Sequence, residues 1–301
     1  MITVLGSINM DLIANVGRLP KPGETVAGSG FSTAAGGKGA NQALAARRAG
    51  SIVRMAGAVG TDNFAADALA LLEGAGADLS LVRAVEGPTG IAVILVGGDG
   101  ENVIAVIPGA NGAVGVSDAQ AAIAGMKRGD VLMLQMEIPP ATIRAGLEAA
   151  KAAGVTTIVN IAPLTADAAG LAGMADIVIA NETEFELLAG RQGLTSAERE
   201  TEMVRLNASG GQTLIVTLGA DGVVAIRDGK LTRTRGLVIE PVDTVGAGDT
   251  FCGYFAAGLD QGRSFEEALR RAAVAGSLAC LKPGAQPAIP LAADVEAALK
   301  P

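Results

Sequence analysis

The segment with the clearest chemical potential is Asp243-Thr-Val-Gly-Ala-Gly-Asp249, which leads directly into a stretch with helical character. Glycines at 246 and 248 allow successive backbone N–H groups to converge at the start of that helix, which is the arrangement of an anion hole. Phosphate-binding loops usually carry a lysine at the position of Asp249. A carboxylate beside an anion hole can accept a proton from a hydroxyl while the hole holds phosphoryl charge. The alternative is that Asp249 only caps the helix.

A second glycine-rich segment, Gly36-Gly-Lys-Gly-Ala-Asn41, also precedes a predicted helix. It is not a Walker loop, because Ser32 stands where the first glycine is required and Gly39 stands where Ser or Thr is required. Its glycines, Gly37 among them, can bring the backbone close to a small ligand, and Lys38 and Asn41 offer hydrogen-bond donors. This combination suits a polyhydroxyl ligand; a plain turn followed by a helix cap is the alternative.

Polar side chains also follow two predicted strands. Asn9 and Asp11 come after the strand Ile2–Leu5, and Glu137 comes after the strand Val131–Leu134. Ligands of open α/β sheets bind beyond the carboxyl ends of the strands. We therefore interpret these side chains as hydrogen-bonding partners for sugar hydroxyls, although each alone could equally cap a loop.

Two further segments could serve a nucleotide. Asn181-Glu-Thr-Glu184 follows the strand Ile177–Ala180, and Thr217-Leu-Gly-Ala-Asp-Gly222 follows Leu214–Val216. Glu184 could orient water molecules on Mg²⁺, which prefers one or two carboxylates together with substrate phosphates. The glycine turn could support a nucleotide; a helix cap and an ordinary β-turn are the alternatives.

The elements that must position these residues alternate along the chain, which predicts an α/β fold with a mostly parallel sheet covered by helices on both faces. The predicted strands are Ile2–Leu5, Ile52–Met55, Val131–Leu134, Thr157–Asn160, Ile177–Ala180 and Leu214–Leu218. The predicted helices between them are Asn41–Ala49, Asn63–Glu73, Ala119–Met126, Pro140–Ala153, Glu182–Ala189 and Ser196–Ser209. The last third predicts a hairpin, Val223–Arg227 with Lys230–Arg235, and two long helices, Asp249–Gln261 and Phe265–Leu281.

Two segments interrupt this alternation. Glu24–Ala35 is strand-like with no helix after it, and Thr89–Ile107 contains two strand-like runs joined by Gly97-Gly-Asp-Gly100, a hairpin signal. We predict that they form a small β-sheet outside the main one, in the place of a lid; ordinary surface hairpins are the alternative.

Composition excludes several classes of protein. The 301 residues contain no histidine, which rules out Ser-His-Asp and Cys-His catalysis and histidine-bearing zinc sites. The two cysteines, Cys252 and Cys280, fit a reducing compartment. A net charge of −8 gives no electrostatic help to nucleic-acid binding. No apolar run approaches the roughly 18 residues of a membrane helix. We expect a soluble cytoplasmic protein with neither nucleic acid nor membrane as partner.

Taken together and in this order, the motifs resemble the ribokinase (phosphofructokinase-B-type) family of sugar kinases. The resemblance runs from Gly6-Ser-Ile-Asn-Met-Asp11 to Gly284-Ala-Gln-Pro287 and includes both glycine-rich signatures. It implies one three-layer α/β domain over residues 1–301, with lid segments at about 12–35 and 89–108 that often pair in a homodimer. It also implies transfer of the γ-phosphate of ATP to the terminal hydroxymethyl group of a pentose, with ribose as the expected sugar.

The resemblance further assigns roles by position. It implies that Asp249 is the catalytic base and that the backbone N–H groups of Gly246, Ala247 and Gly248 hold the transferred phosphoryl group. The implied sugar-binding set is Asn9, Asp11, Gly37, Lys38, Asn41 and Glu137. The implied ATP and Mg²⁺ set is Asn181, Glu184, Thr217, Leu218, Gly219, Ala220, Asp221 and Gly222, together with Gly248. An activating monovalent cation, typically K⁺, is implied at Asp243, Val245, Ala279, Lys282, Gly284 and Ala288, where Ala288 replaces a serine of the family.

Other substrates stay open at this point: deoxyribose, fructose, a sugar phosphate, a nucleoside or a sugar acid. An adenine-bearing nucleoside would need stacking aromatic residues near the lid, and Phe31 is the only one there. A sugar phosphate or sugar acid would need an arginine, and Arg18 in the lid-proximal stretch is the available one. A non-catalytic sugar-binding regulator is the alternative from another class.

Overall fold

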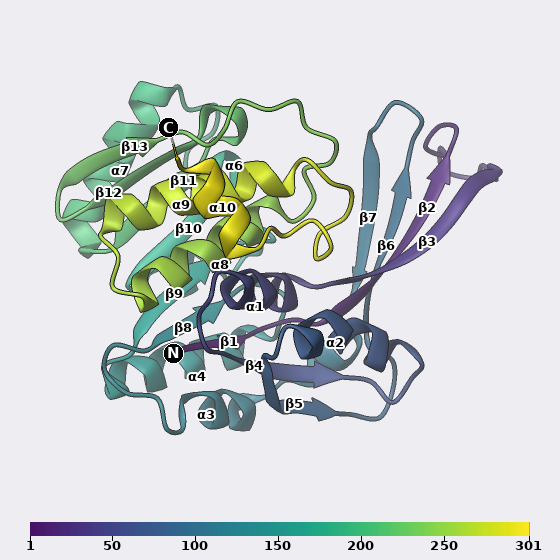
Figure 1. The fold of residues 1–301 in the computed structure, drawn as a ribbon, viewed down its shortest axis with the longest axis horizontal. Coiled ribbons are helices and arrows are strands. Elements are labelled where there is room, and N and C mark those ends of the chain that lie inside the picture. The colour runs from purple at the N-terminus through teal and green to yellow at the C-terminus, as the bar shows by residue number, and fades with distance from the viewer. Residues whose placement is uncertain (301) are drawn as a thin grey trace.

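A nine-stranded sheet forms the centre of the protein in the computed structural model, which describes residues 1–300 (Figure 1). The strand order is β13-β12-β11-β10-β9-β8-β1-β4-β5. Strands β5 to β11 of this order run parallel, and β12 and β13 are antiparallel. The bounds are β1 Ile2–Leu5, β4 Val53–Val59, β5 Asp78–Ala84, β8 Val131–Leu134, β9 Thr156–Asn160, β10 Ile177–Asn181, β11 Thr213–Thr217, β12 Val223–Arg227 and β13 Lys230–Thr234.

Helices cover both faces of this sheet, so the predicted three-layer architecture is confirmed. Successive residues of β8 alternate between the two cores, with Val131 and Met133 in one and Leu132 and Leu134 in the other. The helices of the first core are α1 Lys38–Arg48, α2 Phe64–Gly74, α8 Ala247–Asp260, α9 Phe265–Ala279 and α10 Ala292–Ala298. Those of the second are α3 Val116–Ile123, α4 Pro140–Ala153, α5 Ala168–Ala172, α6 Glu182–Ala189 and α7 Ser196–Gly210.

Helices α1 and α8 approach each other closely because small residues face one another. A Cβ atom added at Gly253 of α8 would lie 2.5 Å from the Cβ of Ala45 and 2.5 Å from the carbonyl oxygen of Gln42, both on α1. The scarcity of aromatic residues, 2% of the chain, thus serves close helix packing. This packing sets the first turn of α8 against the first turn of α1.

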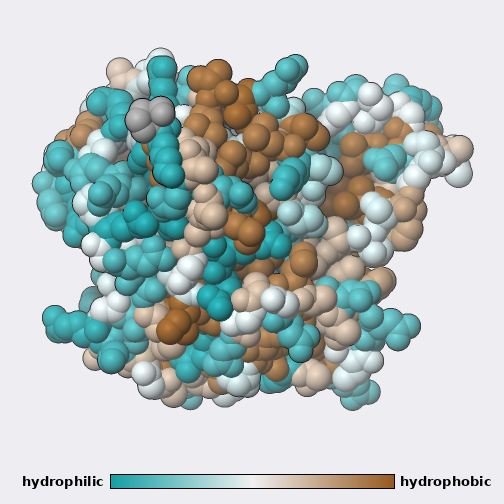
Figure 2. Space-filling view, in the orientation of Figure 1, coloured by the Kyte–Doolittle hydropathy of each residue, from teal (hydrophilic) through white to brown (hydrophobic). Residues whose placement is uncertain are grey.

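A separate four-stranded sheet of order β3-β2-β6-β7 projects from the body, which confirms the predicted second sheet; we refer to it below as the lid sheet, or lid (Figure 1). Its strands are β2 Asn9–Val16, β3 Gly28–Gly36, β6 Gly90–Val96 and β7 Asn102–Ile107. Strand β7 carries exposed apolar side chains, and Figure 2 shows hydrophobic surface in this part of the molecule. Two short 3₁₀ helices, Gly109–Ala113 and Gly219–Asp221, complete the elements used below.

Some expected boundaries were wrong. Asn9 and Asp11 do follow the first strand, but they lie in the strand β2 rather than in a loop. Helix α1 begins at Lys38 rather than Asn41, because Gly37 provides the turn, and α3 ends at Ile123 rather than Met126. Besides the strand β2, the strand β5 and the helices α5 and α10 were not predicted. Strand β5 lies at the sheet edge and mixes polar with apolar residues, and the two helices are short, so none has a strong periodic pattern.

Candidate active site

The site lies at the carboxyl edge of the large sheet, where β1 separates β4 on one side from β8 on the other. In open α/β sheets such a point, at which the chain changes direction across the sheet, opens a crevice for ligands. Asn9 is buried there, and its Oδ1 accepts a hydrogen bond of 2.7 Å from Nδ2 of Asn111. Asn111 is itself fixed by two hydrogen bonds to the backbone of Ile8. The orientation of the Asn9 amide is therefore set, with its Nδ2 directed away from Asn111.

Glycines let the start of α1 lie against the chain that leaves β1. Gly37 has a φ of 87°, and a Cβ atom there would lie 2.7 Å from the backbone nitrogen of Asn9. Only glycine fits this backbone at this distance. The close approach places the backbone N–H of Lys38 on Glu137 and the side chain of Asn41 on Asp249.

Glu137 is held at the centre of this edge by two donors on a single oxygen. Its Oε2 accepts hydrogen bonds from the hydroxyl of Ser7 at 2.6 Å and from the backbone N–H of Lys38 at 3.1 Å. The Ser7 hydroxyl in turn accepts from the N–H of Gly39 at 3.2 Å. This arrangement leaves Oε1 of Glu137 for a ligand.

A cavity of about 330 Å³ adjoins these groups, a volume at the lower end of the range for small-molecule sites. It is lined by Asn9 and Glu137 from the site, by Val106 from the lid, and by apolar residues of the loop after β8. A space between lid and sheet edge is where a small ligand would be shielded from water.

Asp249 lies in the first turn of α8, is 6% exposed, and receives one donor on each carboxylate oxygen. Asn41 Nδ2 donates to Oδ2 at 3.0 Å, and Gln42 Nε2 donates to Oδ1 at 2.9 Å. Both donors come from α1, 207 and 208 residues away in sequence. The buried carboxylate is thus held from both ends.

The predicted anion hole lies at the N-terminus of α8. Gly246 is the N-cap with a φ of 76°, and a Cβ atom there would lie 2.8 Å from that of Ala285, while a Cβ atom at Gly248 would meet nothing within 4 Å. The N–H of Ala247 makes a long bond of 3.3 Å to the carbonyl of Thr244. Helix N-termini favour anions through their free N–H groups and their dipole, so open space beside Gly248 suits a phosphoryl group.

The charged groups of the site act on one another. Burial, reinforced by the charges of Glu137 and Asp249, raises the pKa of Asp11 to about 7. The charge of Asp249, followed by those of Glu137 and Glu184, raises the pKa of Lys38 against the opposing effect of burial. Burial raises the pKa of Glu184. A half-buried ammonium therefore lies in the field of three carboxylates.

The predicted nucleotide residues gather at the next strand ends. Asn181 and Thr217 are register partners at the carboxyl ends of the parallel strands β10 and β11. Asn181 also forms a capping box with Glu184, in which Oδ1 of Asn181 and Oε2 of Glu184 each accept a backbone N–H, at 2.8 and 2.9 Å. Asn181 Nδ2 and Glu184 Oε1 are left for a ligand. The turn Thr217–Gly222 is closed by a hydrogen bond of 2.8 Å from the N–H of Leu218 to the carbonyl of Gly222, with Gly219, Ala220 and Asp221 in the 3₁₀ helix between.

The predicted cation residues form two loops that Asp243 ties together. Its Oδ1 accepts from the N–H of Val245 at 3.0 Å, and its Oδ2 accepts from the N–H of Gly284 at 2.7 Å. The carbonyl of Ala279 accepts weakly, at 3.4 Å, from the N–H of Lys282, and Ala288 is buried nearby in sequence. Each carboxylate oxygen has a single donor and keeps a lone pair, so Asp243 and the main-chain carbonyls of the two loops are both available to a cation.

Sequence reasoning missed five polar residues that hold the site in place: Ser7, Gln42, Asn111, Gln135 and Asn160. All are buried, and each binds another polar group of the site. A signal existed for Gln135 and Asn160, because each stands at the end of a buried apolar strand.

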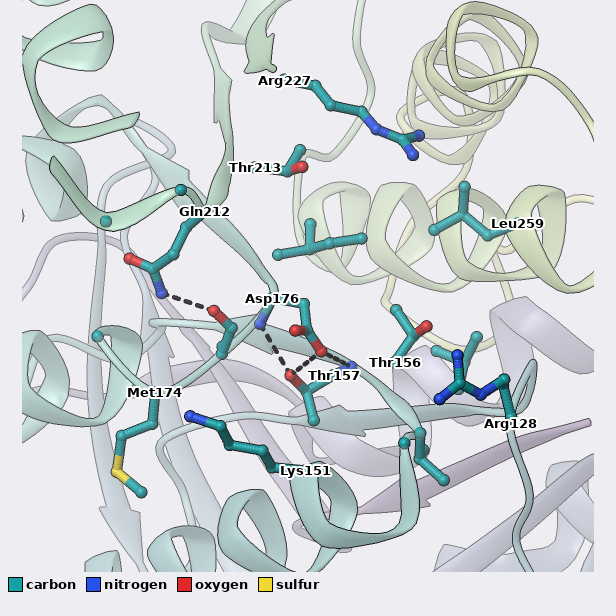
Figure 3. Close-up of a pocket in the computed structure, with 18 of the residues that line it drawn as sticks. Arg128, Lys151, Thr156, Thr157, Met174, Asp176, Gln212, Thr213, Arg227 and Leu259 are labelled. Carbon is teal, nitrogen blue, oxygen red and sulfur yellow. Dashed lines mark hydrogen bonds between the residues drawn. The ribbon is translucent and has the colours of Figure 1, made fainter. Parts of the chain in front are cut away.

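The larger cavity of the molecule, about 790 Å³, lies elsewhere. Its lining includes the first residues of β8, β9, β10 and β11, which places it at the opposite, amino edge of the sheet. Figure 3 shows Arg128, Lys151 and Arg227 around Thr157 and Asp176, with Gln212 to one side. None of the residues predicted to bind sugar or ATP lines it.

Known carbohydrate kinases resemble this chain over nearly its whole length. Residues 1–292 match the model of the pfkB family of carbohydrate kinases. The chain is 35% identical over 290 residues to a ribokinase of Haemophilus influenzae, covering 96% of this chain and 95% of the relative. It is 32% identical over 291 residues to a deoxyribokinase of Salmonella typhi, with 96% and 95% coverage.

Among solved structures, Arabidopsis thaliana ribokinase complexed with ribose and ATP superposes with a TM-score of 0.88 at 33% identity, covering 99% of this chain and 98% of that one. The chain therefore belongs to the pfkB family of carbohydrate kinases. Among residues 1–300, no helix combines the length and the apolar character that crossing a membrane requires.

Proposed function

We propose that this protein transfers the γ-phosphoryl group of ATP to the terminal hydroxymethyl group of D-ribose, giving ribose 5-phosphate. One observation carries the proposal: a buried carboxylate, Asp249, lies at a glycine-lined helix N-terminus next to polar groups that face a small cavity. Relatives named ribokinase, at 33–35% identity over nearly the whole chain, support ribose as the sugar.

Sugar recognition follows from an excess of hydrogen-bond acceptors. Asn41 Oδ1 is a buried acceptor without a partner among the described residues, and Glu137 Oε1 and the carboxylate of Asp11 are also available. Sugar hydroxyls are donors that can satisfy these acceptors. Asn9, held by Asn111, supplies an amide N–H₂ for a sugar oxygen.

The same acceptors argue against phosphorylated or acidic substrates. Glu137 and Asp249 lie close enough to Asp11 to raise its pKa, and these carboxylates would repel a further anion. Arg18 does not offset this charge, since it lies beyond the far end of β2 and pairs with Glu24 at 2.5 Å. Phe31, 70% exposed on β3, offers no enclosed stacking site for a base.

In the proposed reaction Asp249 accepts the proton of the sugar hydroxyl as its oxygen attacks the γ-phosphorus. The bond from that phosphorus to the bridging oxygen of ADP breaks as the new one forms. The N–H groups of Gly246, Ala247 and Gly248 bear the charge of the transferred group, and Lys38 adds a positive charge beside it. The lid excludes water, which would otherwise compete as acceptor.

Two metal ions are expected with the substrates. Glu184, whose Oε1 is free, and Asn181 would hold Mg²⁺ through water on the nucleotide side. Bound there, Mg²⁺ supplies positive charge to the phosphate oxygens of ATP. The two loops joined by Asp243 would hold K⁺ through the carbonyls of Val245, Ala279, Lys282 and Gly284, with the main chain near Ala288.

A homodimer through the lid is also proposed. Phe31, Val93, Val103, Ile104, Val106 and Ile107 expose between 39% and 70% of their surface on the lid strands, and such grouped apolar residues favour a protein interface. Sedimentation of the protein with Val103→Glu should give a lighter species than the unaltered chain. Because the reaction consumes ATP, we place the protein in the cytoplasm.

The test is ADP release from Mg-ATP with ribose, 2-deoxyribose, fructose, fructose 6-phosphate, 2-keto-3-deoxygluconate and adenosine, each with K⁺ and with Na⁺. We expect the highest kcat/KM for ribose and a higher rate in K⁺. Preference for deoxyribose, as the Salmonella relative suggests, would keep the kinase and replace the sugar. Sugar binding without ADP release from any substrate would favour a non-catalytic sugar-binding regulator.

A further inference from the structure

From the buried contacts behind Asp249 we infer that Gln42 is a positioning residue. It fixes the Asp249 carboxylate through a chain of side-chain amides in which the donor and the acceptor of every hydrogen bond are determined. The inference rests on the proposed role of Asp249 as base. Gln42 itself is fully buried, and none of its other side-chain hydrogen-bond partners, Asn160 and Gln135, lines the sugar cavity. Any effect of Gln42 on the reaction must therefore pass through Asp249.

The direction of the chain is set by a main-chain carbonyl. Asn160 Nδ2 donates to the carbonyl oxygen of Ile179 at 3.1 Å, so Asn160 must present its Oδ1 to Gln42. Gln42 Nε2 donates to this oxygen at 3.1 Å and to Oδ1 of Asp249 at 2.9 Å, which uses both of its hydrogens.

The oxygen of the Gln42 amide is fixed by a hydrogen bond as well. Gln42 Oε1 accepts from Nε2 of Gln135 at 2.7 Å, so turning the Gln42 amide over would place oxygen against oxygen at Asp249 and at Asn160, and nitrogen against nitrogen at Gln135. A backbone carbonyl of β10 thus dictates that Asp249 always faces a donor. The strands β9 and β10, the residue that follows β8 and the helix α1 are thereby coupled to the first turn of α8.

This chain is costly to bury, which argues against a merely space-filling role. Gln42 and Gln135 are 0% exposed, and Oε1 of Gln135 has no partner among the described residues. A buried amide oxygen without a donor destabilises a fold, and apolar side chains of similar size would fill the same space at lower cost. What the amides add is orientation, because the carboxylate is held by Asn41 at one oxygen and by Gln42 at the other. Each oxygen then keeps a lone pair for the sugar hydroxyl.

The test is a double-mutant cycle of Gln42→Met with Asp249→Asn, in which methionine keeps the length of the side chain and removes both donors. We expect Gln42→Met alone to lower kcat by about ten- to a hundredfold, the worth of a hydrogen bond to a charged group. Ribose affinity, measured by calorimetry without ATP, should stay within about threefold. In the Asp249→Asn background, Gln42→Met should lower kcat no further.

Asn207→Leu is the matched control, because Asn207 is another buried amide with two hydrogen bonds, to the carbonyl of Gln212 and from the N–H of Gly229. It should lower the Tm as Gln42→Met does and leave kcat unchanged. If Gln42→Met does not fold, Gln135→Met tests the same chain one link further out, with an expected loss of about three- to tenfold in kcat.

Two results would overturn the inference while leaving the kinase intact: equal losses from Gln42→Met in both backgrounds, or a raised ribose Kd with unchanged kcat. An Asp249→Asn variant with undiminished kcat would overturn the base assignment as well, and the cycle distinguishes this case directly.

Discussion

The two edges of the large sheet differ in how many of their polar groups are free to bind a ligand, and this difference does not follow cavity volume. The amino edge has the larger cavity, about 790 Å³ against about 330 Å³ at the carboxyl edge. Yet its uncharged amide and its carboxylate already have partners: Oδ2 of Asp176 accepts from both the N–H and the hydroxyl of Thr157 (Figure 3), and Nε2 of Gln212 donates to the carbonyls of Ala172 and Ala175. The carboxyl edge has the smaller space but keeps acceptors free.

Helix direction explains the contrast. The amino edge receives helix C-termini, such as those of α4 and α7 at Gly154 and Gly211, whose carbonyls repel anions and favour basic neighbours such as Lys151. The carboxyl edge receives the N-termini of α1, α6 and α8, where phosphate is favoured. Unsatisfied groups and helix polarity, rather than volume, therefore locate the site.

Among substitutions that compare the two edges, we expect Asp249→Asn at the carboxyl edge to change kcat most. Because the amide cannot accept the proton of the sugar hydroxyl, kcat should fall by about 10²–10⁴-fold. Ribose affinity should change little, since other groups bind the sugar. Steady-state kinetics with calorimetry measures both quantities, and an unchanged kcat would contradict the assignment.

Glu137→Gln should have the next largest effect, on binding rather than on rate. Loss of a charged acceptor should raise the ribose KM by about tenfold or more and leave kcat within about threefold. The exposed Glu148 on α4 provides the control, because Glu148→Gln should change neither constant. A fall in kcat with constant KM would mean that Glu137 acts in the transition state instead.

Because the pKa of Asp11 is raised, we expect ribose binding to depend on pH. Its raised pKa of about 7 means that the empty site is partly protonated at neutral pH, and sugar hydroxyls prefer the ionised carboxylate. Ribose affinity should therefore weaken as pH falls below about 7, by at most about tenfold for each pH unit. Calorimetry from roughly pH 5.5 to 8.5 in buffers of different ionisation enthalpy should detect proton release on binding.

Asp11→Asn should bind ribose more weakly and remove this pH dependence. An affinity that stays constant over the same range in the unaltered protein would show that Asp11 does not contact the sugar. Asp11 should also lower the free energy of unfolding as pH rises from 3.8 toward about 7. Over this range the carboxyl is already ionised in the unfolded chain but still protonated in the folded one.

The smallest expected effect is at the amino edge. Lys151→Ala and Arg128→Ala remove charge from the large cavity, and we expect kcat and KM to stay within about twofold of the unaltered protein. Greater loss of activity from either variant would show that this cavity takes part in the reaction.

The sequence predicted the parts of this molecule that local pattern encodes. Buried apolar runs such as Val131–Leu134 were placed correctly, and the hairpin around Gly97–Gly100 was correctly assigned to a separate sheet. Asp249 and Lys38 are predicted as site residues because glycines and a helix start lie beside them in sequence. Residues 24–35 were read as strand-like, and β3 occupies most of them.

The sequence could not predict contacts between distant segments. Gln42 meets Asn160 across 118 residues and Asp249 across 207, and neither distance follows from any periodicity. A glutamine on an apolar helix face gives no local sign of its partner. The close packing of α1 against α8, permitted by Gly253, brings Gln42 to Asp249, and the packing of α1 on the sheet brings it to Asn160 on β9.

The most direct test of the central claim is product identification after mixing the protein with Mg-ATP and ribose carrying carbon-13 at its terminal carbon. We predict a phosphorus–carbon coupling at that carbon by NMR, formed rapidly by the unaltered protein and by Lys151→Ala, and at least about a hundredfold more slowly by Asp249→Asn. Phosphorylation of another oxygen, or equal rates in Asp249→Asn and the unaltered protein, would contradict the account of the carboxyl edge as the site where Asp249 activates the sugar.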